Sequence, residues 1–334
     1  MRVYKALKTQ EFKKDEYRIT PIRHEDRIVI MQWRNEQTHH LRQIKPLTSE
    51  IQDKYFEEII APLFNEERPN QILFSFLQNE EVVGYGGLVH INYEDKNAEL
   101  SFVMKTELQK SNFERFWIVY LDLIKRPAFR ELNLRKIYTY AFDVRERLYQ
   151  ALETAGFTLD ARLREHRYVN GDYKDVLVHS FWNPTVNLKI RNAQKEDVDH
   201  YFRWANDTSV RQNSFNPEPI LFENHSGWFE EKLKSDHAKL YIFEVLGKPV
   251  GQFRIDKVDD AWEIDYSVDK SYRGLGVGKA MISLFITTSS NNSLLHPLKA
   301  VVKNSNIASQ RVFQDLGFMK VKEEKGTITY LYEA

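Results

Sequence analysis

The order of hydrophobic and polar positions is nearly the same in the two halves of the chain. Residues 72–88 and residues 241–253 each consist of two apolar runs separated by a short polar turn. This arrangement is typical of a β-hairpin. Strict alternation follows each hairpin, at residues 98–102 and 262–266, and predicts one further strand in each half. The pattern therefore indicates an internal duplication.

Short motifs on either side of these strands repeat in the same order. Residues 33–36 (Trp-Arg-Asn-Glu) and 204–207 (Trp-Ala-Asn-Asp) each follow an Ile-Arg pair and a Glu-Asp pair. Phe157 and Phe318 each follow a glycine near the end of their half. Helical material opens each half after one strand, and a strand, a helix and a strand close it. Self-similarity on this scale indicates two homologous domains.

The repeats place one domain at residues 1–182 and the other at residues 186–334, joined around residues 183–185 (Asn-Pro-Thr). Each domain is expected to be α+β, with a mixed central β-sheet flanked by helices. A chain of 334 residues gives each domain enough length for a core of its own.

Composition narrows the classes of function. The formal net charge is zero, which gives no electrostatic support for binding nucleic acid or an anionic membrane. Cysteine is absent, which excludes disulfides, thiolate metal sites and a cysteine nucleophile. The longest apolar run, residues 116–124, is too short to span a bilayer, and residues 1–17 lack the apolar core of a signal peptide. We expect a cytoplasmic protein without a bound metal, because no His, Asp or Glu cluster has persuasive ligand spacing.

A glycine-rich stretch lies between the predicted strand at residues 262–268 and a helix-like run at residues 280–286. Glycines at every second position allow several backbone N–H groups to turn toward one anion, and the helix start adds its positive dipole end. The stretch therefore predicts a cradle for a diphosphate, with a tight strand-to-helix turn as the alternative. It is not a P-loop, because Ala280 follows the lysine. The residues of the stretch are Arg273, Gly274, Leu275, Gly276, Val277, Gly278 and Lys279.

The second half resembles the GNAT superfamily of N-acetyltransferases. The match is carried by residues 263–268, by Arg273-x-x-Gly276-x-Gly278, by residues 298–302, by Asn306-x-x-Ser309, and by residues 313–318 with their Gly-Phe pair. The resemblance implies that two parallel strands, those holding Ser267 and Val302, splay apart. It also implies that the pantetheine of acetyl-CoA lies in the resulting V and that the diphosphate sits on the glycine stretch. Asn306 and Ser309 are expected to hold the pantetheine region, with helix capping as the alternative.

Acetyl transfer to an amine needs a base, a donor for the developing oxyanion and a group that protonates the thiolate. Glu263 is the first candidate for the base, because members of the family often place one there; His225 is the second. The resemblance implies that the backbone N–H of Val268 is the oxyanion donor. Phe313 stands where the family commonly has a tyrosine that protonates the thiolate. Ser309, a nearby tyrosine or water could replace it, or the thiolate could leave unprotonated.

The substrate-facing end of the second half is similar to amino-sugar acetyltransferases of the pseudaminic acid type. This part of the match includes Arg191, Trp204, residues 211–216 and the His225-x-x-Trp228 motif. It implies a small-molecule acceptor, a primary amine on a nucleotide-linked amino sugar. Acetylation of a protein N-terminus or lysine and a non-catalytic binding protein are the alternatives. A homodimer also remains open.

The first half resembles the same superfamily, but it differs at the cradle. Residues 107–114, which follow the strand there, contain no glycine and two glutamates, Glu107 and Glu114. Side chains and negative charge oppose the close approach of a diphosphate, although Gln109 could still occupy the first cradle position. We expect this half to bind acetyl-CoA poorly and to act in substrate binding, dimer formation or support.

Overall fold

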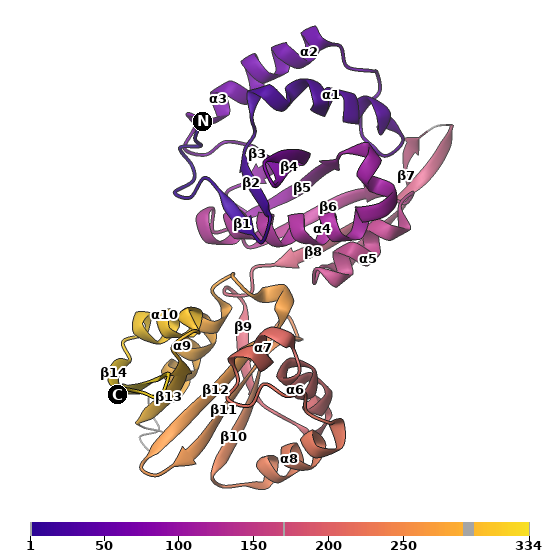
Figure 1. The fold of residues 1–334 in the computed structure, drawn as a ribbon. Coiled ribbons are helices and arrows are strands. Elements are labelled where there is room, and N and C mark those ends of the chain that lie inside the picture. Colours follow the sequence, from indigo (N-terminus) through magenta and orange to yellow (C-terminus); the bar gives the residue numbers. More distant parts are fainter. Residues whose placement is uncertain (1, 170, 290–296, 334) are drawn as a thin grey trace. The chain divides into compact units, whose positions relative to one another are not determined.

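The structure is a computed structural model that describes residues 2–169, 171–289 and 297–333. The chain divides into two compact units, Met1–Asn183 (unit 1) and Pro184–Ala334 (unit 2), and each is described by itself (Figure 1). Both are α+β, with helices packed on a mixed sheet.

Unit 1 is built on an eight-stranded sheet with the strand order β1-β2-β3-β4-β5-β6-β8-β7. Its strands are β1 (Phe12–Lys14), β2 (Tyr17–Pro21), β3 (Ile72–Gln78), β4 (Glu81–Asn92), β5 (Asn97–Met104), β6 (Lys136–Phe142), β7 (Thr158–Val169) and β8 (Asp172–Trp182). Its α-helices are α1 (Arg27–Glu36), α2 (Ser49–Lys54), α3 (Ala61–Leu63), α4 (Gln109–Arg126) and α5 (Glu146–Thr154). Its short 3-10 and π helices are η1 (His24–Asp26), η2 (Thr38–His40), η3 (Tyr55–Ile60), η4 (Thr106–Leu108) and η5 (Pro127–Glu131).

Unit 2 is built on a seven-stranded sheet with the strand order β14-β15-β13-β12-β11-β10-β9. Its strands are β9 (Leu188–Asn192), β10 (Ala238–Val245), β11 (Lys248–Val258), β12 (Ala261–Val268), β13 (Leu298–Lys303), β14 (Met319–Glu324) and β15 (Thr327–Tyr332). Its helices are η6 (Lys195–Asp197), α6 (Val198–Ala205), α7 (Thr208–Asn213), α8 (Phe222–Lys234), η7 (Lys270–Tyr272), α9 (Val277–Ser289) and α10 (Ile307–Asp315).

The two sheets have the same topology apart from the additional edge strand β1. Both contain a single parallel neighbour pair, β5 with β6 and β12 with β13, and every other neighbouring pair is antiparallel. A helix connects the strands of each parallel pair, as a parallel connection requires. The predicted duplication of an α+β fold is therefore confirmed.

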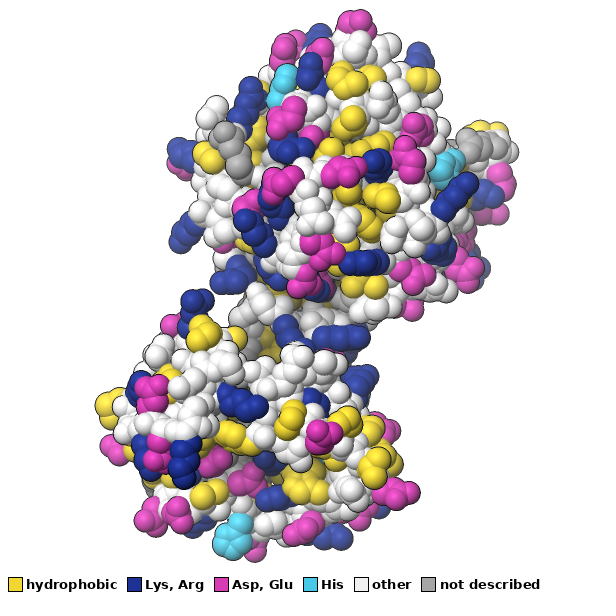
Figure 2. Space-filling view, in the orientation of Figure 1, with side chains coloured by type: hydrophobic (Ala, Val, Ile, Leu, Met, Phe, Trp, Pro, Cys, Tyr) yellow, Lys and Arg dark blue, Asp and Glu magenta, His cyan; other side chains and the backbone are white. Residues whose placement is uncertain are grey.

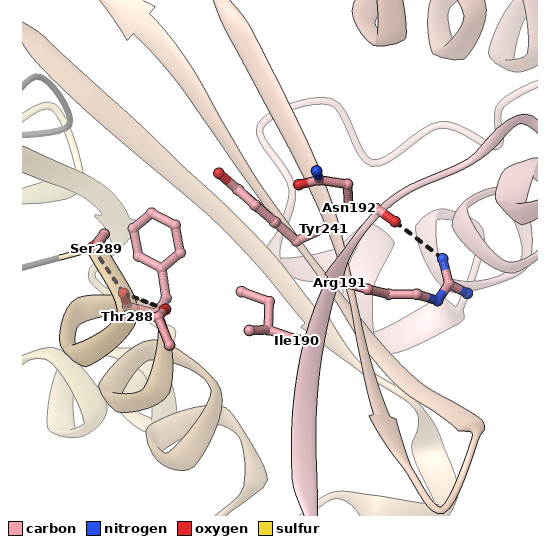
Figure 3. Close-up of a pocket in the computed structure, with 7 residues that line it drawn as sticks. Ile190, Arg191, Asn192, Tyr241, Thr288 and Ser289 are labelled. Carbon is pink, nitrogen blue, oxygen red and sulfur yellow. Dashed lines mark hydrogen bonds between the residues drawn. The ribbon is translucent and has the colours of Figure 1, made fainter. Parts of the chain in front are cut away.

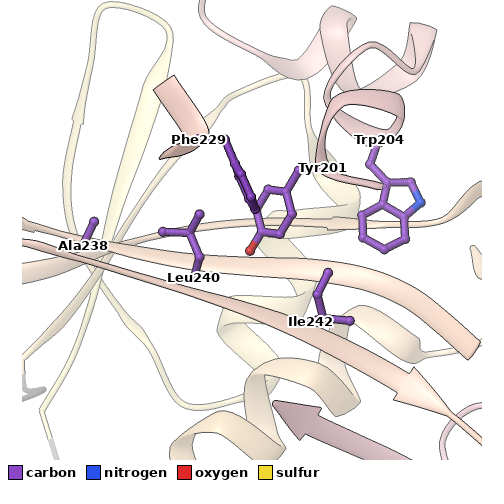
Figure 4. Packing of buried hydrophobic residues seen from close by; sticks show 6 residues of the cluster. All are labelled: Tyr201, Trp204, Phe229, Ala238, Leu240 and Ile242. Atoms are coloured by element: carbon purple, nitrogen blue, oxygen red, sulfur yellow. The ribbon is translucent and has the colours of Figure 1, made fainter. Parts of the chain in front are cut away.

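An aromatic cluster joins α6 and α8 to the sheet of unit 2 (Figure 4). The hydroxyl of Tyr201 donates a hydrogen bond to the carbonyl oxygen of Tyr241 in β10 at 2.9 Å. The indole N–H of Trp204 donates to the carboxylate of Asp269, just beyond β12, at 2.9 Å. These contacts hold α6 against the sheet, and Trp204 places the C-terminal end of α6 beside the residue that follows β12. The buried members of the cluster are Tyr201, Trp204, Phe229, Ala238, Leu240 and Ile242.

Charged side chains of both signs are interspersed over the surface of each unit in the face shown in Figure 2. None of the described helices is long and apolar enough to cross a membrane.

Candidate active site

The parallel strands β12 and β13 separate soon after they begin. Their pairing joins Trp262 with Leu298 and Glu263 with Lys299, although β12 continues to Val268 and β13 to Lys303. The expected splay between the strands that hold Ser267 and Val302 is therefore present. It leaves one edge of β12 available for a ligand.

The backbone of β12 turns its N–H groups toward this opening at every second residue. Gly251 pairs with Val268, and the N–H of Asp269 donates to the carbonyl of Val250 at 2.9 Å. This register makes Gly251 and Val268 a non-hydrogen-bonded pair, so the N–H of Val268 points away from β11 and toward β13. The N–H of Trp262 points the same way and reaches Pro297 at 2.9 Å. The expected oxyanion donor, Val268, thus faces the splay.

The glycine stretch forms an open turn before α9. Gly274 and Gly276 have φ angles of 74° and 82°, a region that favours glycine, and α9 begins at Val277. A Cβ added to Gly278 would lie 3.0 Å from the ring of Tyr266, so this glycine lets the start of α9 approach β12. The first turn of α9 therefore has unpaired N–H groups beside the free edge of β12.

Arg273 and Lys279 at the ends of the stretch are tied to neighbouring elements. Arg273 donates to the carbonyl of Val268 at 2.8 Å and to the carboxylate of Asp207, before α7, at 2.8 Å. Lys279 pairs with Asp315 of α10 at 3.0 Å. Arg273 therefore connects the cradle, the end of β12 and α7.

Asn306 caps α10, because its side-chain oxygen accepts from the N–H of Ser309 at 3.1 Å. The capping alternative thus holds for Asn306. The hydroxyl of Ser309 lies 3.1 Å from that of Tyr266, and burial raises the pKa of Tyr266. Phe313 packs edge-on against Tyr266. A hydroxyl pair, one from β12 and one from α10, therefore lies beside the phenylalanine that replaces the expected tyrosine.

Glu263 lies at the last paired position of the parallel ladder. Its carboxylate forms an ion pair of 2.9 Å with Lys299 of β13, and about a third of its side chain is exposed (33%). Asp265, two residues along β12, accepts from the amide of Gln252 at 2.8 Å. Both carboxylates lie on one face of the strand because side chains alternate.

His225 is buried in α8 and packs among the rings of Phe202, Trp228 and Phe229. Burial lowers its pKa, and the charges of Arg211 and Arg254 lower it further. The imidazole is therefore neutral near pH 7, and it remains the second candidate base.

Two arginines, Arg211 and Arg254, lie close to His225 and Asp265. Arg254 lies over the ring of Trp228 and 4.0 Å from Asp265, and it also pairs with Asp256 at 2.6 Å. Arg211 of α7 donates to the carbonyl of Asn216 at 3.2 Å and to the hydroxyl of Ser214 at 3.0 Å. Among the described residues no carboxylate lies within ion-pair distance of Arg211, although the charge of Asp265 acts on it: burial lowers the pKa of Arg211, and Asp265 opposes that shift. Arg211 is therefore a positive charge without a direct ion pair.

A cavity of about 320 Å³ in unit 2 lies elsewhere (Figure 3). It is at the β9 edge of the sheet, whereas the splay lies between β12 and β13. The hydroxyls of Thr288 and Ser289 on its wall donate to backbone carbonyls of α9. The cavity is therefore separate from the candidate active site.

Comparison with known proteins decides the family. Profiles described as acetyltransferase (GNAT) domains match residues 19–178 and residues 187–319. The chain belongs to the GNAT acetyltransferases. This makes it an N-acetyltransferase of the class that uses acetyl-CoA, with one such domain in each unit.

Individual relatives are distant. Spermidine N(1)-acetyltransferase of Vibrio cholerae serotype O1 is 31% identical over 100 residues, which are 29% of this chain and 54% of that protein. The SPbeta prophage-derived uncharacterized N-acetyltransferase YokL of Bacillus subtilis (strain 168) is 28% identical over 137 residues, 40% of this chain and 77% of that protein. The structure of spermidine N-acetyltransferase from Vibrio cholerae with CoA and spermine has 21% identity and a TM-score of 0.43, covering 51% of this chain and 96% of that one.

The residues of this GNAT chain fit acetyl-CoA in unit 2. The positive φ angles of Gly274 and Gly276, the free edge of β12 and the enclosed, unpaired Nη2 of Arg273 together form an anion-binding strand edge and turn. Among residues 2–169, 171–289 and 297–333, no group of three or more His, Asp or Glu side chains could hold a metal ion.

Unit 1 keeps the splay of the GNAT fold and loses the cradle. β5 and β6 pair only from Asn97 to Glu99, yet α4 begins at Gln109, directly after η4. The cavity beside this helix start, of about 440 Å³, is lined by Glu36, Thr106, Glu107 and Lys110. Its two glutamates disfavour a diphosphate.

Sequence analysis did not identify two side chains of the site by residue. Tyr266 places its hydroxyl beside that of Ser309, and Lys299 pairs with Glu263. Alternation placed Tyr266 on the face opposite Glu263, but its hydroxyl partner lies 43 residues away in sequence. The order of residues around Tyr266 gives no sign of a contact with a residue so distant in sequence.

Proposed function

We propose that unit 2 transfers the acetyl group of acetyl-CoA to a primary amine of a nucleotide-linked amino sugar. The free edge of β12 beside the glycine turn carries the first part of this proposal. Bound acetyl-CoA supplies an activated acetyl thioester. Gly274 to Lys279 hold its diphosphate, and Ser267, Val268 and Ser309 border its pantetheine.

Groups on and beside β12 then accept the proton of the amine, stabilise the oxyanion and protonate the sulfur. Glu263, kept close to the splay by Lys299, accepts a proton from the amine directly or through one water. The N–H of Val268 stabilises negative charge on the acetyl oxygen. The C–N bond to the amine forms as the C–S bond of the thioester breaks, and the sulfur takes up one proton. We assign this proton to the hydroxyl pair of Tyr266 and Ser309, beside Phe313, where one hydroxyl donates and the other hydrogen-bonds to it.

Arg211 supports an acceptor that carries an anionic group. A polyamine such as the spermidine named for a relative is cationic, and Arg211, which has no direct ion pair, would repel it, whereas Arg254 is already paired with Asp256. A nucleotide-linked sugar would instead place phosphate oxygens near Arg211. The amine of a protein N-terminus or lysine is the second candidate acceptor.

Release of CoA thiol measured with a panel of amines tests the proposal. The panel contains a nucleotide-linked amino sugar, the same sugar without the nucleotide, spermidine and a peptide. We expect the highest kcat/KM for the first of these. Replacing Arg211 with Gln should raise KM for the nucleotide-linked sugar roughly tenfold and leave the free sugar unchanged. A preference for spermidine or the peptide would refute the amino-sugar acceptor, and no release with any amine would refute transfer itself.

A further inference from the structure

The open end of the splay in unit 1 is crossed by a chain of polar side chains. Gln37, which follows α1, donates to the carbonyl of Met104 at the end of β5 at 2.9 Å. Its amide oxygen lies 3.3 Å from Nε2 of His40, and Arg145 approaches the same Nε2 at 3.4 Å. Arg145 stands at the start of α5, the position that Asn306 holds at α10 in unit 2.

Arg145 has a charge that nothing in the described part of the chain neutralises. Besides His40, its guanidinium contacts the face of Trp117 at 5.9 Å, and no carboxylate pairs with it among the described residues. Burial lowers its pKa to about 10. An enclosed cation without a counter-ion is costly, and such groups are normally paired.

Two nitrogen atoms in this cluster are enclosed without a hydrogen-bond partner. One is Nε of Arg145, which no described acceptor reaches. The other is Nδ1 of His40, a buried residue with 8% of its surface exposed. The amide N–H₂ of Gln37 donates to Met104 and Thr106, so its oxygen faces Nε2 of His40 as an acceptor. Arg145 faces the same nitrogen as a donor. A single tautomer of His40 satisfies one of these two contacts and leaves the other unmet. Burial and the charge of Arg145 lower the pKa of His40 to about 3, which keeps the ring neutral.

The guanidinium of Arg145 has an unsatisfied Nε–H and no carboxylate partner among the described residues, so it would be stabilised by a ligand that is negatively charged and accepts hydrogen bonds. We propose that unit 1 binds an oxyanion, a phosphate or carboxylate group, at Arg145, beside His40 and across the open end of its splay. His39, whose ring lies 4.7 Å from that of His40, borders the site. Unit 1 is then a ligand-binding unit, and this inference does not rest on catalysis by unit 2.

Histidine signals in nuclear magnetic resonance spectra of the full chain test the site. Inorganic phosphate and acetate are titrated separately while the Cε1–H resonances of His39 and His40 are followed. His39→Gln and His40→Gln variants assign these resonances. Saturable shifts with either anion support the site and identify the source as phosphate or carboxylate. Because both reporters belong to unit 1, binding to the cradle of unit 2 does not enter the measurement.

Matched arginine variants complete the test. Arg145→Gln should weaken the saturating anion roughly tenfold to a hundredfold. Arg147→Gln, two residues along and paired with Glu114, should leave the affinity unchanged. Arg145→Lys keeps the charge and should retain most of the affinity, which separates loss of the site from loss of the fold. Shifts that do not saturate with either anion, or that are the same in Arg145→Gln and Arg147→Gln, would overturn the proposal.

Discussion

The segments from Lys105 to Arg115 and from Asp269 to Lys279 have the same length and follow corresponding strands, yet they fold differently. In unit 1, α4 begins at Gln109 immediately after η4. In unit 2, Arg273 to Gly276 separate η7 from α9. Two residues of the second segment adopt positive φ, which glycine accepts readily and other residues do not. The segment of unit 1, which has no glycine, therefore continues directly into α4 and has no open turn that corresponds to the cradle.

The strands before these segments, β5 and β12, share a glutamate at the same position. Glu99 and Glu263 both hold the last paired position of the parallel ladder. Glu99 is enclosed by Arg42 at 2.5 Å and by His90 at 3.0 Å, whereas Glu263 has Lys299 and is one-third exposed. Unit 1 thus keeps the carboxylate but surrounds it with protein partners. The comparison teaches that one family fold can keep its splay while changing what the splay holds.

The largest expected effect is on acetyl-CoA binding. Gly276→Glu puts a charged side chain at positive φ in the cradle and should weaken acetyl-CoA at least roughly a hundredfold. Asn112→Glu, the corresponding change in unit 1, should leave the affinity unchanged. Calorimetric titration measures both and should give one acetyl-CoA per chain in the wild type. A stoichiometry of two would show that unit 1 binds the coenzyme without glycines.

Removing the proposed base comes next. Glu263→Gln should preserve acetyl-CoA binding and lower the rate roughly a hundredfold, mostly below neutral pH, where the amine is hardest to deprotonate. The matched variant Glu99→Gln should leave the rate of CoA release intact. Equal rates for Glu263→Gln and wild type across the pH range would exclude Glu263 as the base.

A smaller effect is expected from the hydroxyl pair. Tyr266→Phe introduces the side chain that unit 1 has at Phe102, and it should reduce kcat roughly tenfold with little change in KM. Ser309→Ala is the companion variant, because it removes the other hydroxyl. If both variants retain full kcat, the thiolate leaves without help from this pair.

The smallest effect concerns stability. Asp197 accepts from both Nη atoms of Arg191, at 2.6 and 2.8 Å. Burial alone would raise the pKa of Asp197, but the hydrogen bonds from Arg191 and from the N–H of Gln194 lower it overall. The resulting stability is present above the ordinary carboxyl pKa of about 4 and is lost as pH falls below it. Asp197→Asn should cost about 1–2 kcal/mol at pH 7 and less near pH 3. Thermal unfolding at the two pH values measures this, and an equal cost at both would contradict it.

Much of the fold follows from local sequence. Alternation at residues 98–102 and 262–266 predicted β5 and β12, and both form. The Gly-Phe pairs follow α5 and α10 as corresponding positions. The predicted role of Asn306 stays a prediction, although the residue caps its helix. The splay itself was predicted from the resemblance to the family, because strand separation leaves no periodic signal.

Sequence alone determined the duplication, the strand pattern and the loss of the cradle in unit 1, because side-chain alternation and the tolerance of glycine for positive φ depend on neighbouring residues. Tertiary structure decided which charges are paired and which are not. Lys299 pairs with Glu263 across two strands, while among the described residues no carboxylate lies within ion-pair distance of Arg211 or Arg145. Such contacts join residues far apart in sequence, and they exist only once the sheet and its helices have packed.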